Sequence, residues 1–309
     1  MNYTLHQLRI FLEVVERGSI TAAAEALHLT QPAVSVQLKN LQQQFQLPLY
    51  EVVQRRIQIT DFGKEIAALA REMLSMSEQI AQKQALYMGL IEGNLRLSAV
   101  HTGQYIVPFL IRGFNRCYPQ VQIKLWIKDK EQVVKDLSQN CIDFALLTLP
   151  PSSMQLNSLP FMPNYLVPVI GQQSRWQKLR FEDIVPQAPA LLREEGSGTR
   201  QMTDAYLKKK SIAIKHFTDF NSSDAIKQAI IADMGWAILP LVSLRNELLL
   251  GQIQLIETPD FPLRTEWQFV WHKEKRLLPV AQAFLRYVES IQNQFFDEHF
   301  AWMRPFLKG

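Results

Sequence analysis

The stretch that decides the N-terminal fold is residues 18–45, GSITAAAEALHLTQPAVSVQLKNLQQQF. Ser19 and Thr30 are residue types that cap helix N-termini, because their hydroxyls accept a hydrogen bond from an otherwise free amide. Pro32 falls in the first turn after Thr30, where its missing amide hydrogen costs nothing. The stretch therefore predicts a short helix over Ile20–Leu27, a brief turn, and a further helix that begins at Thr30.

Another helix precedes this stretch. Thr4 and Gln7 have the spacing of a capping box, and Gly18 is a natural helix stop. Between them, apolar residues recur at helical spacing, namely Leu5, Leu8, Leu12 and Val15. The first 45 residues thus predict three consecutive helices.

The helix that begins at Thr30 has two different faces. One is an apolar stripe at i, i+4, i+7 and i+11, formed by Val34, Leu38, Leu41 and Phe45. The other carries short polar groups and one cation, and consists of Pro32, Ser35, Val36, Lys39, Asn40 and Gln43. Gln, Ser and Asn can read base edges and Lys can contact phosphate, so this geometry indicates a helix-turn-helix. An ordinary three-helix corner is the alternative.

Longer motifs add a family resemblance. Leu8-Arg9-Ile10-Phe11 and the stretches 18–24 and 29–35 resemble the N-terminal domain of LysR-type transcriptional regulators. Leu49-Tyr50-Glu51 and residues 59–63 resemble that family's wing and the start of its linker helix. The resemblance implies a winged helix-turn-helix over 1–60, with DNA contacts from Thr30, Gln31, Pro32, Ser35, Val36, Lys39, Arg55 and Arg56.

Two positions depart from the family pattern. The family often has a basic residue where Val36 stands and an arginine where Val52 stands. A valine at 36 is able to contact a thymine methyl group, so the departures concern base preference and one wing phosphate contact. Arg55 and Arg56 remain as basic groups in the wing, and their alternative role is ordinary solvated charge.

A seven-residue apolar repeat follows the wing. Its members are Phe62, Ile66, Leu69, Met73, Met76, Ile80 and Tyr87, with Lys83 as the interruption. The helix that carries them would be about 39 Å long at roughly 1.5 Å per residue. A 3.5-residue repeat favours pairing with another helix, so we expect a homodimer; packing on its own domain is the alternative. In the family this is the dimerising linker helix, here 61–92, which Gly89 and Gly93 bring to an end.

The remaining two thirds alternate strand and helix patterns. Expected strands are 95–100, 121–127, 141–147, 190–192, 216–220, 236–239 and 267–271, and expected helices are 107–117, 131–138, 200–209, 223–233 and 279–290. This alternation predicts an α/β fold with a parallel, doubly wound sheet.

The arrangement of these elements resembles the family's two-lobed, periplasmic-binding-protein-like effector domain, here 93–309. Lobe I would comprise about 93–167 and 268–309, and lobe II about 168–267, with chain crossings near 166–169 and 265–269. The aromatic-rich end, Phe295–Gly309, is expected to cover an apolar patch or an interface.

Polar residues at strand ends form the candidate ligand site. They are His101, Thr102, Gln104, Thr148, Ser197, Thr199, Arg200 and Ser222. Ligands of open α/β folds bind at the carboxyl ends of strands, and helix N-termini favour anions, so these residues suit a small oxyanion. Simple helix caps at Thr102, Ser197 and Ser222, and a surface charge at Arg200, are the alternatives.

The family resemblance also extends to this site. It implies ligand roles for Thr102, Thr148 and Thr199. Residues 194–200, EEGSGTR, are similar to the branch that regulates carbon fixation and nitrogen or sulfur assimilation. His101-Thr102 is similar to the sulfur-responsive members.

Composition and net charge limit the classes of protein to which the chain can belong. The 309 residues carry a net charge of +4, but residues 1–92 hold eight Lys and Arg against nine Asp and Glu, so global charge does not locate a DNA-binding end. No apolar run approaches the roughly 20 residues that span a bilayer, and the start lacks a signal-peptide pattern, so we expect a cytoplasmic protein. Cys117 and Cys141 are expected to be small core residues.

Motifs of several enzyme classes are missing from the sequence. There is no Walker loop, no G-x-G-x-x-G after a strand, no G-x-S-x-G elbow and no zinc-type His/Cys spacing. We therefore expect neither an enzyme nor a cofactor or metal site.

The combined interpretation is a transcriptional regulator that binds an inverted-repeat promoter site as a dimer and responds to a small anionic metabolite between its lobes. The family implies a tetramer of two dimers that bends DNA, with RNA polymerase as a further candidate partner and no membrane association. Two rival interpretations are a two-lobed solute-binding protein or enzyme, and a DNA-binding protein without an effector.

Overall fold

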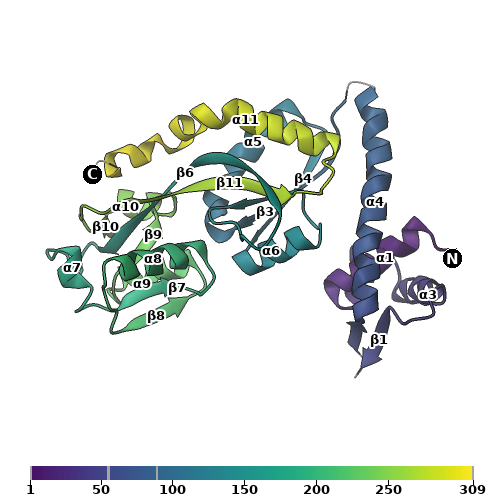
Figure 1. Ribbon diagram of the computed structural model, residues 1–309, viewed down its shortest axis with the longest axis horizontal. Helices are drawn as coiled ribbons and strands as arrows, with labels where there is room; N and C mark the ends of the chain where they lie inside the picture. Colours follow the sequence, from purple (N-terminus) through teal and green to yellow (C-terminus); the bar gives the residue numbers. More distant parts are fainter. Residues whose placement is uncertain (1, 54–55, 88–89, 308–309) are drawn as a thin grey trace. The chain divides into compact units, whose positions relative to one another are not determined.

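A computed structural model describes residues 2–53, 56–87 and 90–307 (Figure 1). The chain forms two compact units, one chiefly Met1–Gly93 and the other Asn94–Ser138 with Ile142–Gly309. Arg55, which the sequence analysis placed in the wing, lies outside the described residues.

The first unit begins with three capped helices. They are α1 (Leu5–Arg17), α2 (Ile20–Ala26) and α3 (Gln31–Gln42). Thr4 and Gln7 form the predicted capping box, and the Ser19 and Thr30 side chains each accept from an amide three residues ahead. Gly18 ends α1 with a φ of 62°, a left-handed conformation that glycine adopts without a steric penalty. All three N-caps confirm the sequence analysis.

The third helix is shorter than its apolar stripe predicted. It ends at Gln42, and Phe45 lies beyond it. The ring of Phe45 stacks on Tyr3 and meets Phe62 edge-on, with centroids 5.9 Å apart in both pairs. Phe45 therefore joins the same core from the segment after the helix, so the extension of α3 to residue 45 was wrong.

The two faces of α3 differ as the sequence predicted. Val34, Leu38 and Leu41 are buried against α1 and α2. On the opposite face Val36 is 55% exposed, and Lys39 is also exposed. A hairpin of β1 (Tyr50–Val53) and β2 (Arg56–Ile59) follows, with Tyr50 paired to Ile59.

A long helix, α4 (Asp61–Tyr87), completes this unit. Ala67 and Ala70 are buried in the core that α1 contributes to, and Phe62 and Ile66 pack against it. The remaining members of the heptad repeat are exposed, namely Leu69, Met73, Met76, Ile80 and Tyr87. The helix thus packs on its own unit through its small residues and leaves most of its large apolar residues uncovered.

The second unit is built on a seven-stranded mixed sheet. Its order is β10-β6-β11-β5-β3-β4, and β9 also pairs with β6. The strands are β3 (Gly93–Val100), β4 (Val121–Lys128), β5 (Phe144–Leu147), β6 (Leu156–Gly171), β9 (Ala237–Pro240), β10 (Ile253–Leu255) and β11 (Leu263–His272). A separate parallel pair consists of β7 (Ala190–Arg193) and β8 (Phe217–Phe220).

The expectation of a parallel sheet was only partly right. β3 and β5 are parallel, but β11 runs antiparallel to both β5 and β6, and β6 runs antiparallel to β9 and β10. The reason is that β6 and β11 are long and pair with each other from Leu156–His272 to Leu166–Leu263. One end of this pair joins β5, and the other joins β9 and β10, so the two strands connect the two halves of the sheet.

Helices cover the sheet on both faces. They are α5 (Val107–Cys117), α6 (Lys130–Ser138), α7 (Phe181–Ile184), α8 (Gly198–Lys209), α9 (Ser223–Ile231), α10 (Arg245–Leu249) and α11 (Pro279–Phe300), with 3-10 turns η1 (His101–Tyr105), η2 (Leu241–Ser243) and η3 (Ala301–Phe306). Phe284 of α11 packs on Phe144 and Phe269 of the sheet. The neighbouring positions Ala145 and Val270 pack with α6, because alternate strand residues face opposite sides.

The aromatic C-terminus is an ordered extension of α11. Phe295 packs against Phe161 of β6, and Phe300 meets Phe109 of α5 edge-on. Phe295, Phe300 and Met303 are buried. Of the two expectations for this segment, the structure shows the first: it covers an apolar patch of its own unit.

The two cysteines do not lie where the sequence analysis placed them. Cys117 is exposed at the last position of α5, and Cys141 is half-buried before β5 begins at Phe144. Among the described residues, neither forms a disulfide. The prediction of core cysteines was wrong because Cys117 lies at the exposed end of α5 and Cys141 lies in the connection between α6 and β5. Within the described ranges, no helix is long and apolar enough to cross a bilayer.

The division of α3 into two faces yields a stability prediction. Leu38→Ala should lower the free energy of unfolding by about 2–5 kcal/mol, because it leaves a cavity in the core. Val36→Ala, on the exposed face of the same helix, should change it by less than about 0.5 kcal/mol. Urea denaturation of both variants measures the difference, and equal losses would contradict the assignment of the two faces.

Candidate functional site

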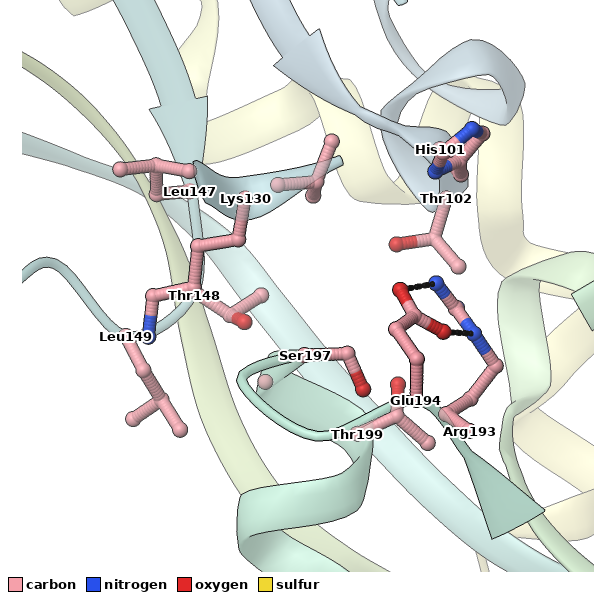
Figure 2. A pocket seen from close by; sticks show the side chains of 12 residues that line it. His101, Thr102, Lys130, Leu147, Thr148, Leu149, Arg193, Glu194, Ser197 and Thr199 are labelled. Carbon is pink, nitrogen blue, oxygen red and sulfur yellow. Dashed lines mark hydrogen bonds and ion pairs between the residues drawn. The ribbon is translucent and has the colours of Figure 1, made fainter. Parts of the chain in front are cut away.

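Three strand ends converge on one small pocket of the second unit (Figure 2). β3 ends at Val100 and is followed by His101 and Thr102. β5 ends at Leu147 and is followed by Thr148 and Leu149. β7 ends at Arg193 and is followed by Glu194. Ser197 to Thr199, at the start of α8, and Lys130 of α6 complete the lining. The pocket lies where ligands of α/β folds bind, outside the carboxyl ends of strands.

Hydroxyl groups face this pocket from both sides. Figure 2 shows the Thr102 and Thr148 hydroxyls directed into the same space as Ser197 and Thr199. Ser197 also caps α8, since its Oγ accepts from the Arg200 amide at 3.1 Å. The start of a twelve-residue helix adds the positive end of its dipole, which favours an anion.

Glycine at 198 permits a close approach across the pocket. A Cβ at Gly198 would lie 2.9 Å from Oγ1 of Thr148, closer than real contacts of this kind. Gly198 therefore has a packing role that its sequence context, which suggests only a turn, does not reveal. Gly196, two residues earlier, has a φ of 87° and serves the turn itself.

The pocket contains two basic side chains. Arg193 is 5% exposed, and its guanidinium makes a bidentate ion pair with Glu194 and donates to Ser223 Oγ at 3.0 Å. Lys130 donates to Oε1 of Gln201 at 3.2 Å, and burial lowers the pKa of its ammonium group. A bound anion would favour the charged form of this lysine.

One imidazole nitrogen at the pocket is unsatisfied. His101 Nδ1 is buried without a hydrogen-bond partner in the described residues. Buried polar atoms are normally paired, and an orphan at a pocket wall is a candidate contact for a ligand.

Three of the predicted ligand residues, Gln104, Arg200 and Ser222, are not part of the pocket lining. Gln104 donates to Asp224 at 3.2 Å, and Ser222 caps α9 by accepting from the Asp224 amide. Arg200 makes ion pairs with Asp204 at 3.0 Å and Asp219 at 2.7 Å. Burial by itself would lower the pKa of Arg200, but the bonds to these two carboxylates outweigh it and raise the pKa above its ordinary value. His101, Thr102, Thr148, Ser197 and Thr199 are the predicted residues that the structure brings together.

Gln104 belongs to a polar network beside the pocket. Tyr105 OH donates to Asp224 at 2.7 Å, and Lys227 contacts Asp224 and Glu247 at 2.9 Å each. Burial and the bond to Asp224 raise the pKa of Tyr105 to about 12. Burial opposes the charge on Lys227, but its carboxylate partners raise its pKa above the ordinary value. The network ties η1 to α9 through groups more than one hundred residues apart in the chain.

Sequence reasoning missed Lys130, Arg193 and Glu194. Arg193 and Glu194 stand at the start of the stretch 193–200, but no pattern indicated that the arginine would be buried and paired. Lys130 reaches the pocket from a helix that carried no motif. Among the described residues, no group of His, Cys, Asp and Glu is placed to hold a metal ion.

The first unit presents a second candidate surface. Gln31, Pro32, Val36 and Lys39 are exposed on α3, and Ser35 is partly exposed beside them. Arg56 lies exposed at the start of β2. The basic side chain and the short polar groups of the helix thus share one solvent-facing side, as a recognition helix requires.

Fold and surfaces together define a class: a helix-turn-helix DNA-binding unit joined in one chain to an α/β unit with a polar ligand pocket. Residues 5–64 match the family described as bacterial regulatory helix-turn-helix protein, lysR family, and residues 89–292 match the LysR substrate binding domain. The chain therefore belongs to the LysR family of transcriptional regulators, which are not enzymes, and this confirms the resemblance identified in the sequence.

Similar proteins indicate which branch of the LysR family this chain resembles. The transcriptional activator CmpR of Synechocystis sp. is 36% identical, over 93% of this chain and 95% of that protein. A RuBisCO operon transcriptional regulator of Acidithiobacillus ferrooxidans is 31% identical, over 92% and 93%.

A solved structure, the Synechocystis CcmR regulatory domain in complex with 2-PG, is 26% identical with a TM-score of 0.61. The match covers 65% of this chain and 98% of that one. Residues 194–200 had indicated a branch that regulates carbon fixation and nitrogen or sulfur assimilation, and these relatives confirm the carbon-fixation part of that prediction.

Proposed function

We propose that this protein regulates carbon-assimilation genes by binding an inverted-repeat promoter site, and that a small anion in the pocket at the start of α8 modulates that binding. The single observation that carries the effector half is the convergence of Arg193 and Lys130 with Thr102, Thr148 and Ser197 at three strand ends. The similarity to regulators named for the RuBisCO operon supports the class of genes.

The DNA-binding part of the proposal assigns the major-groove contacts to α3. The contact residues are Thr30, Gln31, Pro32, Ser35, Val36 and Lys39, with Arg55 and Arg56 in the wing. The exposure of the α3 side chains supports this, whereas Arg55 is outside the described residues. The corresponding domains are 1–60 for DNA binding, 61–92 for the linker and 93–309 for the effector. A promoter-binding protein of this kind would act in the cytoplasm.

The oligomeric part of the proposal is a homodimer formed through α4. Five large apolar residues of the heptad repeat are exposed, and Met76 among them is 64% exposed. A regular a/d seam buries such residues against a second copy of the same helix. The tetramer and a contact with RNA polymerase follow from the family resemblance alone.

The ligand in this proposal is a small phosphorylated or carboxylated anion such as 2-phosphoglycolate. Support comes from the basic and hydroxyl groups of the pocket and from the ligand named in the CcmR structure. Thr102 and Thr148 come from chain segments before β6, whereas Arg193 and Ser197 come after it. A ligand that bridges them would bind the two lobe arrangements unequally, which is what coupling requires.

The DNA contact of Lys39 is testable by salt dependence. Lys39→Ala should weaken binding to all duplexes and reduce the slope of log affinity against log salt by about 0.9, because one phosphate contact is lost. Ser35→Ala should instead cost more on the promoter than on random DNA. Fluorescence anisotropy over a salt series measures both. An unchanged slope for Lys39→Ala would remove this residue from the phosphate contacts.

The dimer seam is testable by charge insertion. Met76→Lys should dissociate the dimer, since a buried ammonium at a heptad position is costly, while leaving the monomer folded. Ala68→Lys is the matched control, because Ala68 is exposed on α4 outside the repeat. Analytical ultracentrifugation gives the mass. If Met76→Lys keeps the mass of the unmodified protein, α4 does not form the interface.

The effector pocket is testable by removing one hydroxyl. Thr102→Val should abolish the effect of 2-phosphoglycolate on promoter binding, while the affinity for DNA without ligand stays within about twofold. In the unmodified protein, ligand at 100 times its dissociation constant should add about 2.7 kcal/mol of stability. Thermal shift and anisotropy provide the two readouts. A response that survives in Thr102→Val would show that the ligand binds elsewhere.

A further inference from the structure

The buried arginine of the pocket already has an anionic partner. Arg193 Nε and Nη2 each lie 2.6 Å from a carboxylate oxygen of Glu194, and Nη1 lies 3.0 Å from Ser223 Oγ. This is the fork geometry in which arginine binds carboxylates and phosphates most strongly. The side of the guanidinium that an incoming anion would use is therefore occupied.

The carboxylate of Glu194 lies within the pocket itself. Figure 2 shows it beside the Arg193 guanidinium, and both Arg193 and Glu194 belong to the lining. Because the two oxygens of Glu194 bond to Nε and Nη2 of Arg193, a phosphate or a carboxylate reaches these donors only by displacing that side chain.

The geometry of Glu194 permits its side chain to leave without a change in the main chain. Its amide donates to the Phe220 carbonyl at 2.8 Å, which holds the backbone at the end of β7. The side chain is 27% exposed, in contrast to the 5% of Arg193. A rotation about the side-chain bonds moves the carboxylate towards water and frees the guanidinium fork.

We propose that Glu194 is an internal competitor of the effector: it neutralises Arg193 in the empty pocket, and an anionic ligand binds by displacing its carboxylate. This inference rests on the proposed anion pocket and adds the side chain that a ligand has to displace. An uncompensated buried arginine is costly, so Glu194 stabilises the empty state. A ligand succeeds only if it replaces the bidentate contact and adds bonds to the surrounding hydroxyls.

The competition disfavours anions that cannot replace both bonds from Glu194 to Arg193. Chloride is a single atom and has no pair of oxygens to bond to the Arg193 guanidinium. It therefore cannot match the two bonds that Glu194 forms. A phosphate monoester with a carboxylate supplies two oxygens to Arg193 and further acceptors for Thr102 or Ser197. Glu194 thus sets a threshold that an abundant simple anion does not pass.

The test is calorimetric titration of the full-length protein with 2-phosphoglycolate and with inorganic phosphate. Glu194→Gln keeps the size of the side chain but removes its charge, so the competitor becomes a neutral hydrogen-bond partner. Because charge-assisted bonds are worth roughly twice a neutral one, we expect both anions to bind about tenfold more tightly. Without ligand, the same variant should melt at a lower temperature, because Arg193 loses its counter-charge.

Glu195→Gln is the matched control. Glu195 is the next residue, it is exposed, and it is absent from the lining, so this variant changes the net charge equally without touching Arg193. Its affinity for both anions should remain within about twofold. If it tightens as much as Glu194→Gln, the gain comes from net charge and the competitor role is wrong. Glu194→Asp retains the charge with a shorter arm and should bind more tightly than the unmodified protein but less tightly than Glu194→Gln.

The possible outcomes separate this inference from the proposed function. If the unmodified protein binds 2-phosphoglycolate and Glu194→Gln binds it equally or more weakly, Glu194 is a ligand contact or a bystander and the inference is overturned. If neither protein binds either anion, the anion pocket itself is refuted and the inference with it. Should Glu194→Gln fail to fold, as circular dichroism would reveal, the comparison with Glu194→Asp decides the question.

Discussion

The antiparallel pairing of β6 with β11 is the constraint on which the ligand-binding unit depends. These strands are long enough for one end of the pair to join β5 and the other to join β9 and β10. This pairing runs from Leu156–His272 to Leu166–Leu263 with one irregularity between Trp267 and Gln268, and it holds the two halves of the sheet together. The ends of β3, β5 and β7 consequently meet at one pocket, although they lie nearly one hundred residues apart in the chain.

The pocket formed in this way is a site of competing charges. Arg193 is buried, and a buried guanidinium needs a partner whether or not a ligand is present. Glu194 provides that partner in the empty pocket. The neighbouring network around Lys227 follows the same rule with Asp224 and Glu247. Both ion pairs are polar features of a unit that otherwise depends on apolar burial, and both lie where the two halves of the sheet approach each other.

In the DNA-binding unit, packing of the core and contact with DNA are assigned to opposite faces of the same helix. One side of α3 supplies the core, and the other presents short polar side chains and Lys39 to solvent. The long helix α4 makes the same division, since its alanines pack inwards and its large apolar residues remain uncovered. An uncovered apolar stripe of this regularity is favourable only if another surface buries it, as the proposed homodimer would.

Local chemistry in the sequence was sufficient to predict the capped helices, the long helix and the alternation of strands and helices, and the family resemblance added the wing. The caps at Ser19 and Thr30 and the heptad repeat are patterns of neighbouring residues. They can therefore be recognised in the sequence without tertiary information. Five ligand candidates were also visible, because hydroxyls at strand ends form a pattern. The direction of β11, the position of Phe45 and the exposure of Cys117 depended on contacts between distant segments. So did the burial of Arg193, the arrival of Lys130 and the placement of Gln104 outside the pocket, since only the folded chain decides which polar groups lose water and which partners they then find.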